Sequence, residues 1–301
     1  MESPWHLYEN LERRNVIMKT KPFQDQVVIV TGASAGIGRA LALQLAVQEA
    51  RVTLAARRTE RLEQVAMECR ELGGEALVIP TDVSDEAQCK ALIEKTIHKY
   101  GKLDMLINDA GLAVVALFED YPDLNLFQHT MGVNFYGAVY CTYYALPHLK
   151  RSQGRIVAIS SMGGKAALPY NTPYHASKYA LHGFYESLRM ELKQHGVSVT
   201  LICPSWVASE FHEAQMDKNG FPRGKERGRV YYSKSTMTSE RCAEITLRAA
   251  AKRRREVLMS PGYLAVWLKV LSPKLLDWIV VKVFLGAATR RARKNLGISK
   301  K

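Results

Sequence analysis

The sequence lacks the features of disulfide-stabilised, secreted and membrane-spanning proteins. Its five cysteines are scattered without a Cys-x-x-Cys pair, which favours reduced thiols and argues against a disulfide framework or a zinc site. Its eight histidines show no metal-ligand spacing, so no metal is predicted. Residues 1–22 form a polar N-terminal extension without the apolar core of a secretory signal. No stretch approaches the roughly 18–20 uncharged residues of a membrane span, and we therefore expect a cytoplasmic protein.

The net charge of +13 gathers at one end of the chain. From Lys252 onward, thirteen Lys and Arg stand against two acids, Glu256 and Asp277, so the remainder is almost neutral. This distribution argues against a nucleic-acid-binding core. Residues 261–301 are predicted to form a basic, apolar helical tail. Two alternatives stay open for it: peripheral contact with an anionic membrane surface, and packing against a second subunit or the domain's own pocket.

Between residues 23 and 260, short apolar runs alternate with helical patterns. The predicted strands are 26–31, 52–56, 76–80, 103–107, 155–160, 197–203 and 256–259. Predicted helices include 59–72, 85–100 with Ser84 as its cap, 123–150, a helix through Tyr174 to about 194, and 239–252. Such alternation predicts an α/β domain with a parallel sheet and helices on both faces. Residues 205–237 break the rhythm and are predicted to be a substrate lid, with a disordered loop as the alternative.

A glycine-rich turn joins the first predicted strand to a helix. Gly32, Gly36 and Gly38 let the backbone approach a pyrophosphate, whose charge would meet the N–H groups of the helix start. After the second strand stand Arg57 and Arg58, where NAD-binding folds usually hold an acid for the ribose 2′-hydroxyl. Two arginines suit the 2′-phosphate of NADP instead. The alternative is that both are solvated charges at a helix start.

Tyr174 and Lys178 are four residues apart, so both lie on one face of a helix, one turn from each other. An ammonium close to a phenol favours the phenolate. A tyrosine held in this way can pass a proton to or from an alcohol near neutral pH. On its own, however, the pair is also typical of surface or packing residues.

Several motifs in this order resemble the short-chain dehydrogenase/reductase family, over roughly residues 23–260. The matching positions are Thr31–Gly38 (TGxxxGIG), Asp82 (the aspartate that meets adenine), Asn108–Gly111 (NNAG), Asn134 (the active-site asparagine), Ser161 thirteen residues before the tyrosine, and Tyr174/Lys178 (YxxxK). The resemblance implies a Rossmann-like, doubly wound sheet of about seven strands. It also implies a homodimer or homotetramer, and the charge distribution described above predicts no nucleic-acid partner.

The resemblance also implies catalytic roles. Tyr174 is the general acid/base, and Lys178 lowers its pKa and holds the nicotinamide ribose. Ser161 steadies the substrate oxygen, and Asn134 holds a water that relays protons. Hydride moves between nicotinamide C4 and the carbonyl carbon. Ser160 competes for the role of Ser161, and the spacing favours Ser161.

Cofactor contacts are implied for Tyr174, Lys178 and a larger set. This set is Gly32, Ser34, Ala35, Gly36, Ile37, Gly38, Arg57, Arg58, Asp82, Val83, Asn108, Ala110, Gly111, Pro204, Val207 and Ser209. Two departures from the family pattern stand out. Asp109 replaces the second Asn of NNAG, which puts a carboxylate near the adenine side and affects cofactor affinity or its pH dependence. Ser205 takes a glycine position of PGxxxT, and Ser209 would supply the hydroxyl for the nicotinamide end.

The sequence thus predicts an NADP(H)-dependent oxidoreductase acting on CH–OH groups, which interconverts a carbonyl and an alcohol. The basic pair and the apolar tail resemble the branch of 11β-hydroxysteroid dehydrogenases and related lipid-handling reductases, which implies an apolar, steroid- or lipid-like substrate. One alternative is an ester hydrolase, since Ser34 also fits a Gly-x-Ser-x-Gly elbow. The other is a cofactor-binding regulatory protein without turnover.

Overall fold

The structure is a computed structural model that describes residues 21–224, 236–259 and 263–285. The N-terminal extension before Lys21, residues 225–235 of the predicted lid and the basic end of the tail from 286 lie outside the described residues.

Within the described residues, seven strands form one parallel sheet in the order β3-β2-β1-β4-β5-β6-β9. They are β1 (Val27–Thr31), β2 (Arg51–Ala56), β3 (Glu75–Pro80), β4 (Met105–Asn108), β5 (Arg155–Ile159), β6 (Ser198–Pro204) and β9 (Glu256–Met259). Val30 on β1 pairs with Leu54 on β2 and Ile107 on β4. The strand order reverses between β1 and β4, so a ligand crevice is expected at their carboxyl ends. The predicted doubly wound α/β fold is confirmed.

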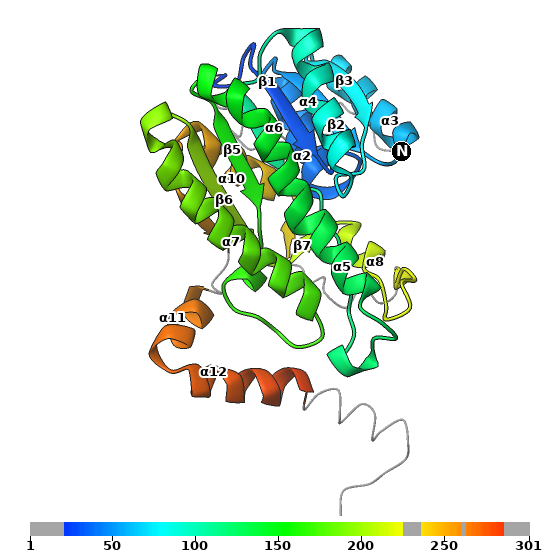
Figure 1. The fold of residues 1–301 in the computed structure, drawn as a ribbon, viewed down its shortest axis with the longest axis vertical. Helices are drawn as coiled ribbons and strands as arrows, with labels where there is room; N and C mark the ends of the chain where they lie inside the picture. Colours follow the sequence, from blue (N-terminus) through cyan, green and yellow to red (C-terminus); the bar gives the residue numbers. More distant parts are fainter. Residues whose placement is uncertain (1–20, 225–235, 260–262, 286–301) are drawn as a thin grey trace, which may run out of the picture.

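Helices cover both faces of the sheet (Figure 1). One layer contains α2 (Gly36–Val47), α3 (Thr59–Glu71) and α10 (Ser239–Ala251), which bury Leu41, Leu62 and Leu247 against the sheet. The opposite layer contains α4 (Glu86–Tyr100), α6 (Gly137–Arg151) and α7 (Thr172–Leu192). Each face therefore has its own apolar cluster, and the strands between them are apolar on both sides.

Two local predictions are corrected. The helix predicted over 123–150 is divided into α5 (Asn125–Met131), a π-helical turn η2 (Gly132–Tyr136) and α6. The cap of α4 is Asp85, whose Oδ1 accepts hydrogen bonds from the N–H groups of Ala87 and Gln88. The predicted cap, Ser84, donates its hydroxyl to Asp82 Oδ1 at 2.7 Å instead. The carboxylate wins because it stands nearer the helix start and accepts two N–H groups.

The predicted lid and tail carry short elements. The lid contains β7 (Val207–Ala208), which pairs with β8 (Met237–Thr238), and α8 (Phe211–Ala214). The tail contains α11 (Tyr263–Leu271), α12 (Pro273–Val280) and a π-helical turn η6 (Val281–Leu285), with exposed Trp267 and Trp278. These helices lie beyond the end of the sheet (Figure 1). None of the helices in the described residues has the length and apolar character needed to cross a membrane.

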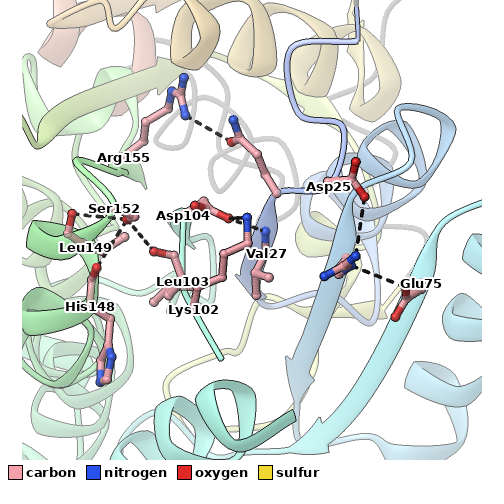
Figure 2. Close-up of polar contacts among 12 residues, drawn as sticks. Asp25, Val27, Glu75, Lys102, Leu103, Asp104, His148, Leu149, Ser152 and Arg155 are labelled. Atoms are coloured by element: carbon pink, nitrogen blue, oxygen red, sulfur yellow. Dashed lines mark hydrogen bonds and ion pairs between the residues drawn. The ribbon is translucent and has the colours of Figure 1, made fainter. Parts of the chain in front are cut away.

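The amino-terminal ends of the strands are held by paired polar groups (Figure 2). Asp104 Oδ2 accepts a hydrogen bond from the Val27 N–H at 2.8 Å and pairs with Lys102 Nζ at 2.9 Å. Arg51 on β2 lies 3.4 Å from a carboxylate oxygen of Glu75 on β3. These contacts tie neighbouring strands together at the edge away from the crevice.

Candidate active site

The turn between β1 and α2 is built around glycine. Gly32 has a φ of +72°, and a Cβ there would lie 2.9 Å from the backbone nitrogen of Ala110. A Cβ at Gly38 would lie 2.4 Å from the carbonyl oxygen of Gly32. Ala35 is the N-cap of α2, its own side chain makes no capping hydrogen bond, and the first turn of the helix contains no acid. The turn therefore fits the pyrophosphate of the predicted nucleotide.

The loop after β4 lies between this turn and Lys178. Thr31 Oγ1 accepts hydrogen bonds from the N–H groups of Asp109 and Ala110, both at 3.1 Å. A Cβ at Gly111 would lie 3.8 Å from Lys178 Nζ. The fold thus brings three predicted cofactor segments to the carboxyl ends of β1 and β4.

Ser161 and Tyr174 share a side-chain hydrogen bond. Ser161 precedes the short 3-10 helix η3 (Met162–Gly164), and its Oγ accepts a hydrogen bond from the Gly163 N–H at 3.0 Å. Burial raises the pKa of Tyr174 to about 12, the bond with Ser161 opposes this, and the negative charge of Asp109 adds to it. The phenol is therefore protonated at neutral pH.

Lys178 binds the main chain of β5. Its Nζ donates to the carbonyl oxygen of Ile159 at 2.8 Å and lies 5.6 Å from the centroid of the Tyr174 ring. Burial lowers the pKa of Lys178 to about 8, against the opposing charge of Asp109. The sequence predicted that this lysine would depress the pKa of Tyr174. In this structure the net shift is upward, because the burial of the phenol outweighs the hydrogen bond with Ser161, and the effect of Lys178 on this pKa stays a prediction.

A chain of hydrogen bonds joins Asn134 to the start of α7. Asn134 Oδ1 accepts from the Leu112 N–H at 2.8 Å, and its Nδ2 donates to the Leu112 carbonyl oxygen and to Ser177 Oγ, both at 2.9 Å. Ser177 Oγ donates in turn to the carbonyl oxygen of Tyr174 at 2.7 Å. Asn134 therefore fixes the position of the tyrosine through the backbone. Its predicted role in holding a water stays a prediction.

The neighbouring serine, Ser160, faces a different way. Its N–H donates to the carbonyl oxygen of Ile202 at 2.7 Å, and its buried Oγ has no hydrogen-bond partner among the described residues. A Cβ at Gly164 would lie 2.9 Å from that oxygen. Of the two serines, Ser161 is the one hydrogen-bonded to Tyr174.

His175, next to Tyr174, fits against the serine segment. Its buried ring approaches the carbonyl oxygen of Gly163 through Nδ1 at 3.0 Å. A Cβ at Gly163 would lie only 2.4 Å from the same nitrogen, so only glycine allows this approach. Burial lowers the pKa of His175, which keeps the ring neutral at neutral pH.

The sequence suggested that the Asp109 carboxylate lies near the adenine side, but in the structure it lies close to Gly38 and Lys178. It accepts a hydrogen bond from the Gly38 N–H and acts electrostatically on Lys178. Burial raises the pKa of Asp109 to about 7, against the effect of the lysine. Asp109, the departure from the family pattern, therefore lies between the glycine turn and Lys178.

At the adenosine end, Arg57 is exposed and lies close enough to act on Asp82. Burial alone would raise the pKa of Asp82, but hydrogen bonds from Ser84 and the charge of Arg57 outweigh it, and the pKa is lowered. Arg58 Nη2 donates to Ser34 Oγ in the glycine turn at 3.0 Å. Among the described residues, no histidine or carboxylate is hydrogen-bonded to Ser34, so a hydrolase nucleophile would lack its base there.

Asn108 was predicted to contact the cofactor. Its side chain is hydrogen-bonded in the packed interior, so that contact stays a prediction for its backbone. Its Nδ2 donates to Tyr185 Oη at 2.9 Å and to Thr142 Oγ1 at 3.2 Å. These partners belong to α7 and α6. The side chain therefore ties the sheet to its helices and does not face the crevice.

The segment after β6 returns to the glycine turn. Pro204 ends β6, Val207 is buried in β7, and Ser209 follows. A Cβ at Gly36 would lie 3.4 Å from Ser209 Cβ. The structure therefore brings Ser209, predicted from the altered PGxxxT pattern, against the start of α2.

Three residues at the site were not predicted. Arg61 forms an ion pair with Glu210, and the rings of Phe211 and Tyr174 have centroids 6.0 Å apart. Arg61 follows Arg58 by three residues, so helical spacing alone places it one turn farther along the same face. No sequence pattern marks Glu210 or Phe211, because both reach the site through the fold of the lid.

The fold also gathers His182, Cys203 and Glu256, whose ligand atoms lie within 4.8 Å of one another. Spacing along the chain gave no sign of this group, because its members come from α7, β6 and β9. Lys165 Nζ lies 2.7 Å from Glu256 Oε1 and already supplies a positive charge there. Burial lowers the pKa of His182 to about 4 and raises that of Cys203 to about 12, so both are neutral and the charges here are those of the Lys165–Glu256 ion pair.

Comparison with known proteins gives a consistent result. The sequence profile of one family, described as short chain dehydrogenase, matches residues 26–220. An 11-beta-hydroxysteroid dehydrogenase of Pinus massoniana is 38% identical over 284 residues, covering 93% of this chain and 80% of that protein.

Two solved structures share the fold. A short chain dehydrogenase/reductase of Burkholderia phymatum in complex with NAD has a TM-score of 0.77 at 26% identity, over 84% of this chain and 96% of that one. An alcohol dehydrogenase of the archaeon Thermococcus sibiricus, complexed with 5-hydroxy-NADP, has a TM-score of 0.67 at 24% identity, over 78% and 96%. The second likeness is one of fold alone.

Proposed function

The chain belongs to the short-chain dehydrogenase family, and from that premise we propose that it is an NADP(H)-dependent carbonyl reductase and alcohol dehydrogenase with Tyr174 as general acid/base. Membership makes it an oxidoreductase of carbonyl and alcohol groups. The observation that carries the assignment of Tyr174 as general acid/base is the grouping of three side chains: Ser161 acts on Tyr174 through a hydrogen bond, and Lys178 Nζ lies 5.6 Å from the centroid of the tyrosine ring. These three residues lie next to the loop after β4, which contacts the glycine turn.

Proton transfer is assigned to Tyr174. In the reductive direction, its phenolic proton passes to the substrate oxygen as the carbonyl becomes an alcohol. The burial that raises the pKa of Tyr174 keeps the phenol protonated at neutral pH, so the proton that it is proposed to donate is present. In the oxidative direction the phenolate takes the alcohol proton, so oxidation should gain as the pH rises.

The surrounding residues orient the reaction. Ser161 Oγ is proposed to hydrogen-bond the substrate oxygen and to stabilise its developing charge. Lys178, held by the carbonyl oxygen of Ile159, is proposed to hold the nicotinamide ribose. When bound, the nicotinamide supplies or accepts the hydride. Asn134 keeps the first turn of α7 in register through Ser177.

Arginines support the preference for NADP(H). Arg57 and Arg58 follow β2, and Arg58 Nη2 also donates to Ser34 Oγ of the glycine turn, so we expect a guanidinium to meet the adenosine 2′-phosphate. The two solved neighbours carry NAD in one case and an NADP derivative in the other, so the arginines carry this proposal.

The substrate is proposed to be apolar and steroid- or lipid-like. Phe211 packs against Tyr174, and Trp206 is 41% exposed, so aromatic surface stands at the catalytic end of the crevice. The name of the Pinus massoniana relative, a hydroxysteroid dehydrogenase, points the same way.

Replacement of Tyr174 tests the proposal. NADPH oxidation is followed with a panel of ketosteroids, quinones, 3-oxoacyl thioesters and small aldehydes. Tyr174→Phe removes the transferable proton and should lower turnover about 10²–10⁴-fold, with nucleotide affinity kept. Tyr179→Phe makes the same change farther along α7 and should retain turnover.

Full turnover by Tyr174→Phe would refute the mechanism. Tight NADPH binding by the unchanged protein without hydride transfer to any member of the panel would favour the regulatory alternative.

A further inference from the structure

A carboxylate of the lid meets the arginines beside the glycine turn. Glu210, the residue before α8, forms an ion pair with Arg61 of α3, and its Oε2 lies 3.9 Å from Arg58 Nη1. The lid segment and the start of α3 are 149 residues apart in sequence. The contact therefore bridges two sides of the crevice.

Arg58 contacts both the lid and the glycine turn. While Nη1 faces Glu210, its Nη2 donates to Ser34 Oγ at 3.0 Å. In a sheet of this topology, the end of β2 lies beside the adenosine ribose of a dinucleotide. Guanidinium groups bind carboxylates and phosphates through the same fork of donors. Glu210 and a ribose 2′-phosphate would therefore draw on the same donors.

The ion pairs are exposed enough to exchange. The side chains of Arg58, Arg61 and Glu210 are 51%, 47% and 53% exposed. Pairs of this kind contribute little to folding stability and are readily replaced by another anion. A ligand anion can therefore replace Glu210 at the two arginines with little loss of folding stability.

Neighbours of Glu210 touch the rest of the crevice. Ser209 lies against Gly36 of the glycine turn, and the ring of Phe211 lies 6.0 Å from that of Tyr174. Three successive lid residues thus contact the glycine turn, the arginines and the catalytic tyrosine. Any anion that displaces Glu210 acts on a segment that also borders the catalytic end.

We propose that Glu210 is a specificity-determining residue that competes with the 2′-phosphate of NADP(H) for Arg58 and Arg61. NAD(H) has no such phosphate and leaves the ion pair in place. Glu210 therefore lowers the affinity for NADP(H) but not that for NAD(H). It thereby reduces the preference for NADP(H) over NAD(H) that the arginines create. This inference rests on the proposed use of NADP(H).

The test compares dissociation constants for NADPH and NADH, measured by protein fluorescence titration on the full chain. Glu210→Gln keeps the shape and removes the charge. The dissociation constant for NADPH should fall about threefold to tenfold, with that for NADH unchanged, and the gain should shrink at high salt. Adenosine 2′,5′-bisphosphate should show the same gain as NADPH, because it carries the 2′-phosphate without the nicotinamide.

Glu213→Gln is the matched control. Glu213 lies on α8, three residues after Glu210, and forms no ion pair among the described residues. The substitution makes the same change in net charge and should leave both dissociation constants unchanged. In a complementary arm, Arg61→Gln should weaken NADPH binding and spare NADH.

Three results would overturn the inference: an unchanged NADPH-to-NADH ratio in Glu210→Gln, an equal gain for both nucleotides, or the same gain in Glu213→Gln. If the unchanged protein reduces carbonyls with NADPH, these results leave the proposed function standing. Absence of any nucleotide binding would overturn both.

Discussion

The two ends of the parallel sheet treat polar groups in opposite ways. At the amino ends, Asp104 is matched with a backbone N–H and with Lys102 (Figure 2). At the carboxyl ends, the Ser160 hydroxyl is buried without a hydrogen-bond partner among the described residues, and burial shifts the pKa values of Asp109 and Tyr174 away from their ordinary ranges.

The polar groups at the amino ends stabilise the fold, whereas the buried ionisable groups at the carboxyl ends reduce its stability. Satisfied polar contacts at one edge stabilise strand pairing. Buried ionisable groups at the other edge cost free energy, because their charged forms are poorly solvated. Such unfavourable environments are typical of functional sites, where reactivity depends on them. Substitutions at the two edges should therefore have opposite consequences.

Among the substitutions that compare the two edges, the largest effect on turnover is expected from Ser161→Ala at the carboxyl edge. Removal of the hydroxyl bonded to Tyr174 should lower turnover about 100-fold, since a donor to the developing oxyanion is lost. The melting temperature should change little. The comparison variant is Ser160→Ala, which removes a hydroxyl without a hydrogen-bond partner among the described residues and should keep turnover. Equal losses in the two variants would show that the serine segment acts only by its shape.

An effect on stability is expected at Asp109. Its pKa in the folded protein is raised from 3.8 to about 7, so the folded protein holds this proton more tightly than the unfolded chain. The free energy of unfolding therefore falls as the pH rises from about 4 to about 7, by on the order of 4 kcal/mol. Asp109→Asn does not titrate and should exceed the parent protein in stability by that amount at pH 8.

Urea denaturation of both proteins at pH 4.5 and pH 8 measures this difference. Near the lower pH the two should be nearly equal, because the aspartate is protonated in the folded state. A variant that is less stable than its parent at pH 8 would mean that the carboxylate is well paired there, against the contrast drawn between the two edges.

The smallest effect is expected at the amino edge. Asp104→Ala removes the acceptor of the Val27 N–H and should lower the free energy of unfolding by about 1 kcal/mol, with kcat/KM unchanged. Asp104→Asn keeps an oxygen acceptor and should recover much of that loss. Thermal denaturation and turnover of both variants decide the matter, and a large loss of turnover would break the separation of the two edges.

Much of the fold was predictable because its signals are local. Apolar β-branched runs, glycine turns and helical spacing stand together in the chain, and they predicted the seven strands of the sheet. The spacing of Tyr174 and Lys178 was visible for the same reason. The π-helical turn at Asn134 was not, because it accompanies contacts with Leu112 and Ser177, each made across the fold.

The electrostatics of the site were the least predictable part. The pKa of Tyr174 depends on how deeply the phenol is buried, which no spacing reveals. The place of the Asp109 carboxylate depends on the Gly38 N–H, and Glu210 reaches Arg61 only through the path of the lid. Residues far apart in sequence meet in each case.

The close fit of His175 against Gly163 has a consequence for every hydroxyl substitution at this site. The contact between the His175 ring and the Gly163 backbone sets the distance between the segment of Ser161 and the helix of Tyr174. The hydroxyls of Ser161 and Tyr174 do not set it. Removing the hydroxyl of Ser161 or of Tyr174 should therefore leave the other hydroxyl in its position. A side chain added at Gly163 would keep both hydroxyls but change the distance between them, because it would collide with the His175 ring.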